Sequence, residues 1–175
     1  MIDYKHTYPL TAEAAAALGV KPGIPVVPTS SDGGLNQVGV GASVEGVMTF
    51  SVGTSGAIRL TTAQPVLPDQ PSTWCYMSPK AWLSGAATNG CCNCIDWYKD
   101  VSYGEIEKGI TDRETNPVFL PFLFGERCPG WNDERKGGFL EILPKHKAND
   151  LYLAVQEGVL FNLYHCYKML TKVNE

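Results

Sequence analysis

The sequence predicts an α/β domain in which helices pack against a sheet. Two apolar β-type runs, residues 46–52 and 57–62, flank a Gly-Thr-Ser-Gly turn and predict a hairpin. Residues 150–173 carry apolar side chains three and four positions apart, which indicates a long helix capped by Asn149 or Asp150. A helix that is apolar over so wide an arc needs a sheet on which to lie, so we expect the two to share one core.

The N-terminal elements are short. Residues 11–19 predict a helix with Thr11 as its N-cap and Gly19 as its C-cap, because a hydroxyl satisfies the first N–H groups and glycine tolerates the left-handed C-cap. Residues 24–28 contain two prolines and favour a brief extended run at an edge. A glycine-rich helix is predicted over residues 32–42, with one face small enough for close backbone approach.

The middle of the chain predicts a second hairpin, between residues 73–77 and 81–84. An amphipathic helix follows over residues 88–100 and a shorter one over residues 103–110. Residues 115–136 are rich in proline, glycine and charge, so they are expected to form an ordered loop. Strands therefore come before helices, and the last predicted helix reaches the end of the sequence.

The composition describes an ordinary soluble protein: 175 residues, 44% hydrophobic and 18% charged. The net charge of −4 provides no basic surface, so nucleic acid is not an expected partner. The first residues lack the pattern of a signal peptide, and no stretch reaches the roughly eighteen apolar residues of a membrane span. We expect a cytoplasmic protein that does not bind membranes.

Three of the six cysteines crowd together at Cys91, Cys92 and Cys94, which favours reduced thiols over a disulfide framework. The cluster invites a zinc hypothesis. Further ligands would have to come from Cys75, Cys128 or Cys166. Structural zinc sites prefer two separated Cys-x2-Cys knuckles, which the sequence lacks. Buried cysteines that act as small apolar side chains are the default interpretation, and no metal ligand is assigned.

Three motifs follow one another along the chain. They are the turn at Asp32, the Gly-Thr-Ser-Gly turn of residues 53–56, and the Phe-Leu-Pro-Phe-Leu-Phe-Gly-Glu-Arg segment of residues 119–127. In this order and spacing they resemble the C-terminal half of the FGGY carbohydrate kinases. The resemblance implies a ribonuclease-H-like, or actin-like ATPase, domain with a mixed sheet and flanking helices. An unrelated glycine-rich β/α protein would have to match all three motifs in order by chance.

The resemblance also implies how the chain is divided. Residues 1–30 correspond to the tail of the family's N-terminal domain and the hinge, and residues 31–175 to a partial C-terminal domain on the nucleotide side. The N-terminal domain, with the first Asp-x-Gly-Thr phosphate motif and most sugar contacts, is expected to be missing, as is the glycine-rich adenosine motif. The chain is therefore expected to be a fragment, with that N-terminal domain as its partner. A homodimer is left open.

Residues 53–59 and 82–90 look most like gluconokinases and next like xylulokinases. The resemblance thus implies an ATP-dependent kinase, with ATP and Mg²⁺ as cofactors and a sugar or sugar acid as substrate. Gluconate is favoured, and xylulose or another ketose or polyol is the alternative substrate. The sequence departs from the family at Glu141, where glycine is usual, and at Gln156, where an apolar residue is usual. An inactive binding or regulatory module of the same fold is the alternative function.

Asp32 matches the position of the family's catalytic aspartate, so the resemblance implies that it is the general base for the sugar hydroxyl. Its alternative role is that of a helix cap. The phosphate loop would be Gly53, Thr54, Ser55 and Gly56, with the Thr54 hydroxyl on the γ-phosphate. From the residues alone, backbone N–H groups in a tight glycine turn suit a phosphate, but an ordinary hairpin turn fits about equally well.

Glu126 and Arg127 are weaker site candidates, and an internal ion pair that orders the loop is the favoured role for both. The aromatic side chains are expected in the core and not as a stacking platform for a base. They are Trp74, Trp82, Trp97 and Phe122.

Overall fold

The structure is a computed structural model that describes residues 6–78, 81–102 and 117–173. Its centre is a four-stranded sheet in the order β3-β4-β6-β5, with every neighbouring pair antiparallel. The strands are β3 (Met48–Val52), β4 (Gly56–Thr62), β5 (Trp74–Met77) and β6 (Trp82–Thr88). Both predicted hairpin pairings are present. Strand β6 extends past the predicted residue 84 because it pairs with the whole length of β4.

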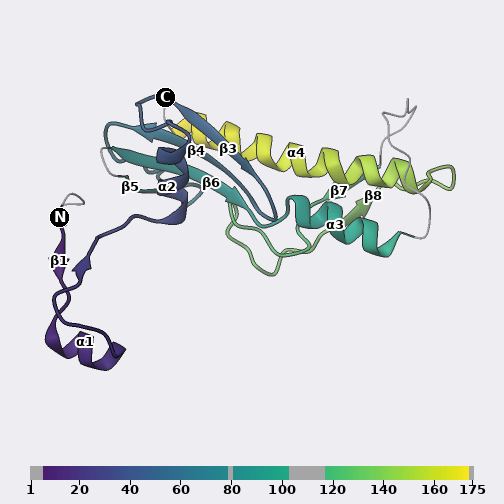
Figure 1. The fold of residues 1–175 in the computed structure, drawn as a ribbon. Coiled ribbons are helices and arrows are strands. Elements are labelled where there is room, and N and C mark those ends of the chain that lie inside the picture. The colour runs from purple at the N-terminus through teal and green to yellow at the C-terminus, as the bar shows by residue number, and fades with distance from the viewer. Residues whose placement is uncertain (1–5, 79–80, 103–116, 174–175) are drawn as a thin grey trace.

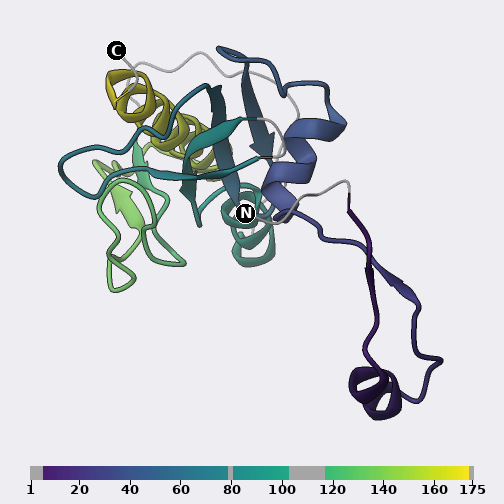
Figure 2. The ribbon, with the colours of Figure 1, turned by 90° about the vertical axis from the view of Figure 1, so that its left-hand side faces the viewer.

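Helices cover both faces of this sheet, because alternate side chains of each strand point to opposite faces. On one face lies α2 (Asp32–Gly39), whose buried Gln37 donates from Nε2 to the Thr61 hydroxyl of β4 at 3.1 Å. On the other face lies α4 (Ala148–Val173), where Leu170 packs with Ile58 of β4. The two views in Figures 1 and 2 show α2 and α4 on opposite sides of the strands.

Helix α4 continues beyond the sheet and forms a second part of the core with α3 (Cys92–Val101) and a short hairpin (Figure 1). This hairpin pairs β7 (Val118–Leu120) with β8 (Gly138–Leu140). Phe119 of β7, Val155 of α4 and Cys94 of α3 meet in one buried cluster. The predicted amphipathic helix is thereby confirmed, starting at Cys92.

The bounds of several predicted elements were wrong: the glycine-rich helix α2 ends at Gly39 and not at residue 42, and α3 starts at Cys92 and not at residue 88. Strand β7 lies inside the segment that was predicted to be a loop, and it forms because Phe119 is 2% exposed and packs against Phe139, their ring centroids 4.9 Å apart. Helix α4 begins at Ala148, before the predicted cap, and Asp150 instead accepts a hydrogen bond from the Lys147 backbone N–H at 2.8 Å. The short helix predicted over residues 103–110 lies outside the described residues.

An N-terminal arm extends away from the sheet (Figures 1 and 2). It pairs β1 (Tyr8–Pro9) with β2 (Pro25–Val26) and carries α1 (Ala12–Leu18) between them. Both predicted caps of α1 are confirmed. The Thr11 hydroxyl accepts from the Ala14 N–H at 3.2 Å, and Gly19 has a φ of 67°.

The predicted α/β class with flanking helices is confirmed. Every strand pair among the described residues is antiparallel, so the parallel strands of the predicted mixed sheet are not among them. Within the described part of the chain, no helix has both the length and the apolar character needed to span a bilayer.

Candidate functional site

A cavity of about 440 Å³ opens on the α2 face of the sheet, beside the first turn of that helix. Its lining draws on the start of α2, the turn between β3 and β4, strands β4 and β5, and the loop after β7. The polar and aromatic side chains from these segments include Asp32, Ser55, Arg59, Tyr76, Arg127 and Trp131. Segments far apart in the sequence therefore meet at one hollow.

This cavity brings together only part of the predicted site. Asp32, Ser55, Gly56 and Arg127 line it, whereas Gly53, Thr54 and Glu126 do not. The three motifs that the sequence singled out therefore converge, each through at least one residue.

Helix α2 positions Asp32 at its first turn. Ser31 is the N-cap, since its Oγ accepts from the Gly34 N–H at 3.2 Å, so the cap role considered for Asp32 falls to the residue before it. One carboxylate oxygen of Asp32, Oδ1, accepts from the Gly33 N–H at 2.8 Å. The side chain stays exposed at the cavity, where the partial positive charge of the helix N-terminus favours a carboxylate. It is placed to accept a proton from a group in the cavity.

The turn between β3 and β4 is a tight hairpin that is hydrogen-bonded to the first residues of α3. The Gly53 and Thr54 carbonyls accept hydrogen bonds from the Cys92 and Asn93 N–H groups, at 3.0 and 3.3 Å. Within the described structure, the backbone N–H groups of Thr54 and Ser55 have no hydrogen-bond acceptor. Helix α3 thus engages two carbonyls of the turn while the Thr54 and Ser55 N–H groups remain available as donors, an arrangement suited to an anion such as phosphate.

The floor of the cavity is a row of residues that stand opposite one another on three strands. Arg59 of β4 pairs with Gly85 of β6, which in turn pairs with Trp74 of β5. A Cβ on Gly85 would overlap the Trp74 indole, so glycine is required for the ring to lie across the strand. Trp74 stacks on Tyr76 with ring centroids 4.6 Å apart. Trp74 was predicted to be core; it packs against the buried sheet cluster, as predicted, and it also lines the cavity.

The other three aromatic side chains lie away from this cavity. Trp97 packs against the core around Phe119, as predicted. Phe122 lies beneath the Arg135 guanidinium, whose carbon is 4.5 Å from the ring centroid. Trp82 is partly buried on β6.

Arg59 was missed as a site residue by the sequence reasoning. The available signal was a lone cation within an apolar β-type run, at a position whose neighbours on the same face, Ala57 and Thr61, are small or polar. A charge in such a position has to face either solvent or a ligand. Here it faces the cavity.

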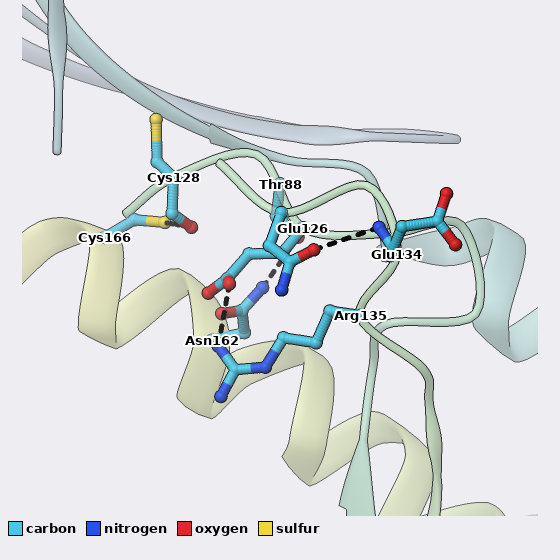
Figure 3. A network of polar contacts seen from close by, with 8 residues as sticks. Thr88, Glu126, Cys128, Glu134, Arg135, Asn162 and Cys166 are labelled. Carbon is cyan, nitrogen blue, oxygen red and sulfur yellow. Dashed lines mark hydrogen bonds and ion pairs between the residues drawn. The ribbon is translucent and has the colours of Figure 1, made fainter. Parts of the chain in front are cut away.

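The predicted Glu126–Arg127 pair does not form. Glu126 is 4% exposed, and its Oε2 binds Arg135 Nη1 at 2.7 Å (Figure 3). Arg127 does not take part in this pair; its side chain is exposed and lines the cavity. The prediction of a loop-ordering ion pair was therefore right for Glu126 and wrong about its partner.

The same region ties the sheet to α4. Asn162 of α4 donates from Nδ2 to the Thr88 hydroxyl of β6 at 2.6 Å, and both side chains are buried (Figure 3). Thr88 also accepts from the Gly90 N–H just before α3. This hydrogen-bonded junction orders the chain that supports the β3–β4 turn.

Four of the six cysteines, Cys91, Cys94, Cys128 and Cys166, are buried and behave as small core residues, whereas Cys75 and Cys92 are partly exposed. Burial and, to a smaller extent, the nearby Cys91 together raise the pKa of the Cys94 thiol to about 12. Burial likewise raises the pKa of Cys91 and of Cys128. Among the described residues, no three His, Cys, Asp or Glu side chains gather as metal ligands. The thiolates that zinc requires are therefore disfavoured here.

Known proteins share this fold along almost the whole chain. The solved structure of a ligand-bound xylulose kinase from Lactobacillus acidophilus matches with a TM-score of 0.78 and 27% identity, over 95% of this chain and 36% of that one. The Bacillus subtilis (strain 168) protein named gluconokinase is 30% identical over 97% of this chain and 36% of its own length. The Escherichia coli (strain K12) protein named xylulose kinase is 32% identical over 88% of this chain and 34% of its own.

The fold and its neighbours define part of an actin-like kinase domain. A family model for the C-terminal domain of the FGGY family of carbohydrate kinases matches residues 48–174. The chain belongs to this family. It spans about a third of the length of its relatives: 36% of the Bacillus subtilis protein and 34% of the Escherichia coli protein.

Proposed function

We propose that this chain is the phosphate-side part of an ATP-dependent carbohydrate kinase that transfers the γ-phosphate to a hydroxyl of a sugar acid, with gluconate as the favoured substrate. The observation that carries the proposal is one cavity that is lined both by Asp32 and by Ser55 and Gly56 of the β3–β4 turn. A kinase needs a proton acceptor on one side of the reacting oxygen and, on the other side, hydrogen-bond donors that hold the phosphate. Xylulose is the second candidate substrate, since relatives bearing that name match at similar identity.

In this mechanism Asp32 accepts the proton of the attacking hydroxyl. The Thr54 and Ser55 N–H groups and the Thr54 hydroxyl hold the γ-phosphate, with Gly53 and Gly56 allowing the chain to turn tightly around it. The outward donors of the turn fit a phosphate. ATP supplies the phosphoryl group. Mg²⁺ fits a cavity with the single carboxylate Asp32, because it is commonly bound by one or two carboxylates together with the nucleotide phosphates and water.

The arrangement of the chain supports a division into two parts. Residues 6–27 extend away from the sheet and bury few side chains of their own, so we assign residues 1–30 to an N-terminal kinase domain and its hinge. Residues 31–175 belong to the C-terminal domain. The relatives are about three times longer than this chain, so we propose that a partner domain closes over the cavity in the complete protein. We place such a kinase in the cytoplasm.

The test uses a complete kinase, meaning this chain joined to an N-terminal domain and to a C-terminal segment with the glycine-rich adenosine motif, both taken from the Bacillus subtilis relative. ADP release is measured with ATP and Mg²⁺ on gluconate, xylulose and glycerol. The proposal expects turnover of about 1–100 per second on at least one of the first two, with gluconate preferred. A folded complete kinase that binds ATP but phosphorylates none of them would overturn it.

A further inference from the structure

Arg59 is a cation whose surroundings in the protein leave it without a countercharge. It is half-buried on β4, and among the described residues no carboxylate lies within ion-pair distance of it. Its Nη1 donates to the Ser51 hydroxyl at 3.0 Å, while its Nε is buried without any acceptor. A buried donor on a charged group is costly to leave unpaired, so its presence beside a cavity calls for a functional explanation, such as a ligand bound by the same guanidinium.

The guanidinium is held in place from several sides. A Cβ on Gly33 would come within 3.0 Å of Arg59 Nε and would also overlap the Tyr76 hydroxyl, so the start of α2 packs directly onto this pair. Tyr76 is in turn fixed by its stack with Trp74. Arg59 therefore presents a fork of donors whose orientation is set before a ligand arrives, which limits the entropy lost on binding.

The charges around the cavity favour an anionic ligand. Among the described residues, the charged groups that line it are one carboxylate, Asp32, and two guanidinium groups, Arg59 and Arg127. The γ-phosphate already has donors on the β3–β4 turn. Arg59 lies farther along β4, level with Trp74 on the cavity floor. The remaining cationic donors are thus available to the second substrate, the one whose hydroxyl faces Asp32.

We propose that Arg59 binds the carboxylate of a sugar-acid substrate and so makes this kinase prefer sugar acids over neutral ketoses and polyols. The proposal rests on the kinase function proposed above and adds the residue that selects the substrate. A planar guanidinium matches a carboxylate through two parallel hydrogen bonds, a geometry that no neutral sugar hydroxyl reproduces. Arg127 is the weaker candidate because its side chain is exposed and, within the described part of the chain, has no counterpart to the bond between Arg59 and the Ser51 hydroxyl.

The first experiment measures kcat/KM of the complete kinase for gluconate, for xylulose and for ATP, in the parent and in Arg59→Gln. Loss of a charge-assisted pair is expected to lower kcat/KM for gluconate by about ten- to a hundredfold, and to leave xylulose within about threefold. Lys99→Gln, which removes an exposed cation on α3, is the matched control and should change neither. Equal losses for gluconate and xylulose, or a loss confined to the KM of ATP, would overturn the proposal.

The second experiment does not depend on turnover. Gluconate and glucitol, which share a carbon chain but differ by the carboxylate, are titrated into the ¹⁵N-labelled 175-residue chain while the Arg59 Nε–H resonance is followed by NMR. Gluconate should shift this resonance in a saturable way, glucitol should not, and Arg59→Lys should bind gluconate more weakly than the parent. If gluconate shifts the Arg127 resonance and not that of Arg59, the assignment is wrong. A gluconate response at Arg59 in a protein that phosphorylates nothing would refute the kinase function while leaving the carboxylate site intact.

Discussion

Replacing Arg135 by glutamine should destabilise the chain more than removal of any exposed surface charge. In the parent, Arg135 binds Glu126 at 2.7 Å, and the Glu126 side chain is only 3% exposed. Without the arginine, a carboxylate remains buried with no countercharge. The loop that carries Arg127 and Trp131 to the cavity should then loosen, because Glu126 also anchors it through its backbone N–H to the Asn132 carbonyl at 2.9 Å.

The size of the effect follows from the exposure of the two partners. Removing one partner of a fully buried pair costs about 3–5 kcal/mol. The Arg135 side chain is 50% exposed, so water can approach the abandoned carboxylate and we reduce the expected loss to about 2 kcal/mol. For a chain of 175 residues this lowers the melting temperature by about 4–8 °C. Glu126→Gln keeps the shape and removes the buried charge, so it should cost only about 1 kcal/mol.

The assay is urea unfolding of the parent, both single variants and the double variant, combined as a double-mutant cycle. The double variant should be more stable than Arg135→Gln alone, since it no longer buries an unpaired charge. Lys136→Gln is the neighbouring control, because its pair with Glu134 spans 3.8 Å between side chains that are 82% and 91% exposed. If Arg135→Gln is no more destabilising than Lys136→Gln, the buried ion pair does not order this loop.

Three further predictions concern the loop, the isolated chain and the thiols. Thr54→Val should lower kcat/KM for ATP about ten- to a hundredfold in the complete kinase while changing ADP affinity much less, because ADP lacks the γ-phosphate; equal losses with a lower melting temperature would make the turn an ordinary hairpin. The purified 175-residue chain, given ATP, Mg²⁺ and gluconate or xylulose, should release no ADP above background, and turnover near 1 per second would contradict the fragment interpretation. Burial raises the pKa of Cys94 and of Cys166 to about 12. Their stabilising contribution is therefore complete below the ordinary thiol pKa and is lost as the pH rises from that pKa toward the raised pKa of the folded protein. Unfolding free energy measured from pH 8 to 11 should therefore fall, and Cys166→Ala should reduce that slope; a slope that stays the same would contradict this.

Local chemistry made much of the fold predictable. Thr11 and Gly19 bound α1 because each satisfies backbone groups within a few residues of itself. The apolar period of α4 indicated its buried face before any partner was known, and Leu170 and Val155 on that face are buried. The crowding of cysteines without paired knuckles correctly indicated core thiols.

What the sequence could not indicate depends on contacts between distant segments. Strand β7 has only three residues, too few for a pattern, and it exists because Phe119 meets Phe139. Glu126 has two arginines nearby in the chain, and only the course of the loop decides that Arg135 is the partner. Arg59 acquires its place in the cavity from the pairing of three strands and the helix start above them.

The most direct test of the kinase account is the kcat of Asp32→Asn in the complete kinase. Asparagine can keep the hydrogen bond that Asp32 Oδ1 accepts from the Gly33 N–H, and it leaves the Ser31 cap in place, so the fold and substrate affinity should persist. It cannot take the proton of the sugar hydroxyl, so kcat should fall about a hundredfold or more. Asp69→Asn, which neutralises an exposed carboxylate outside the cavity, should leave kcat unchanged. A kcat for Asp32→Asn within a few-fold of the parent would show that Asp32 is not the general base.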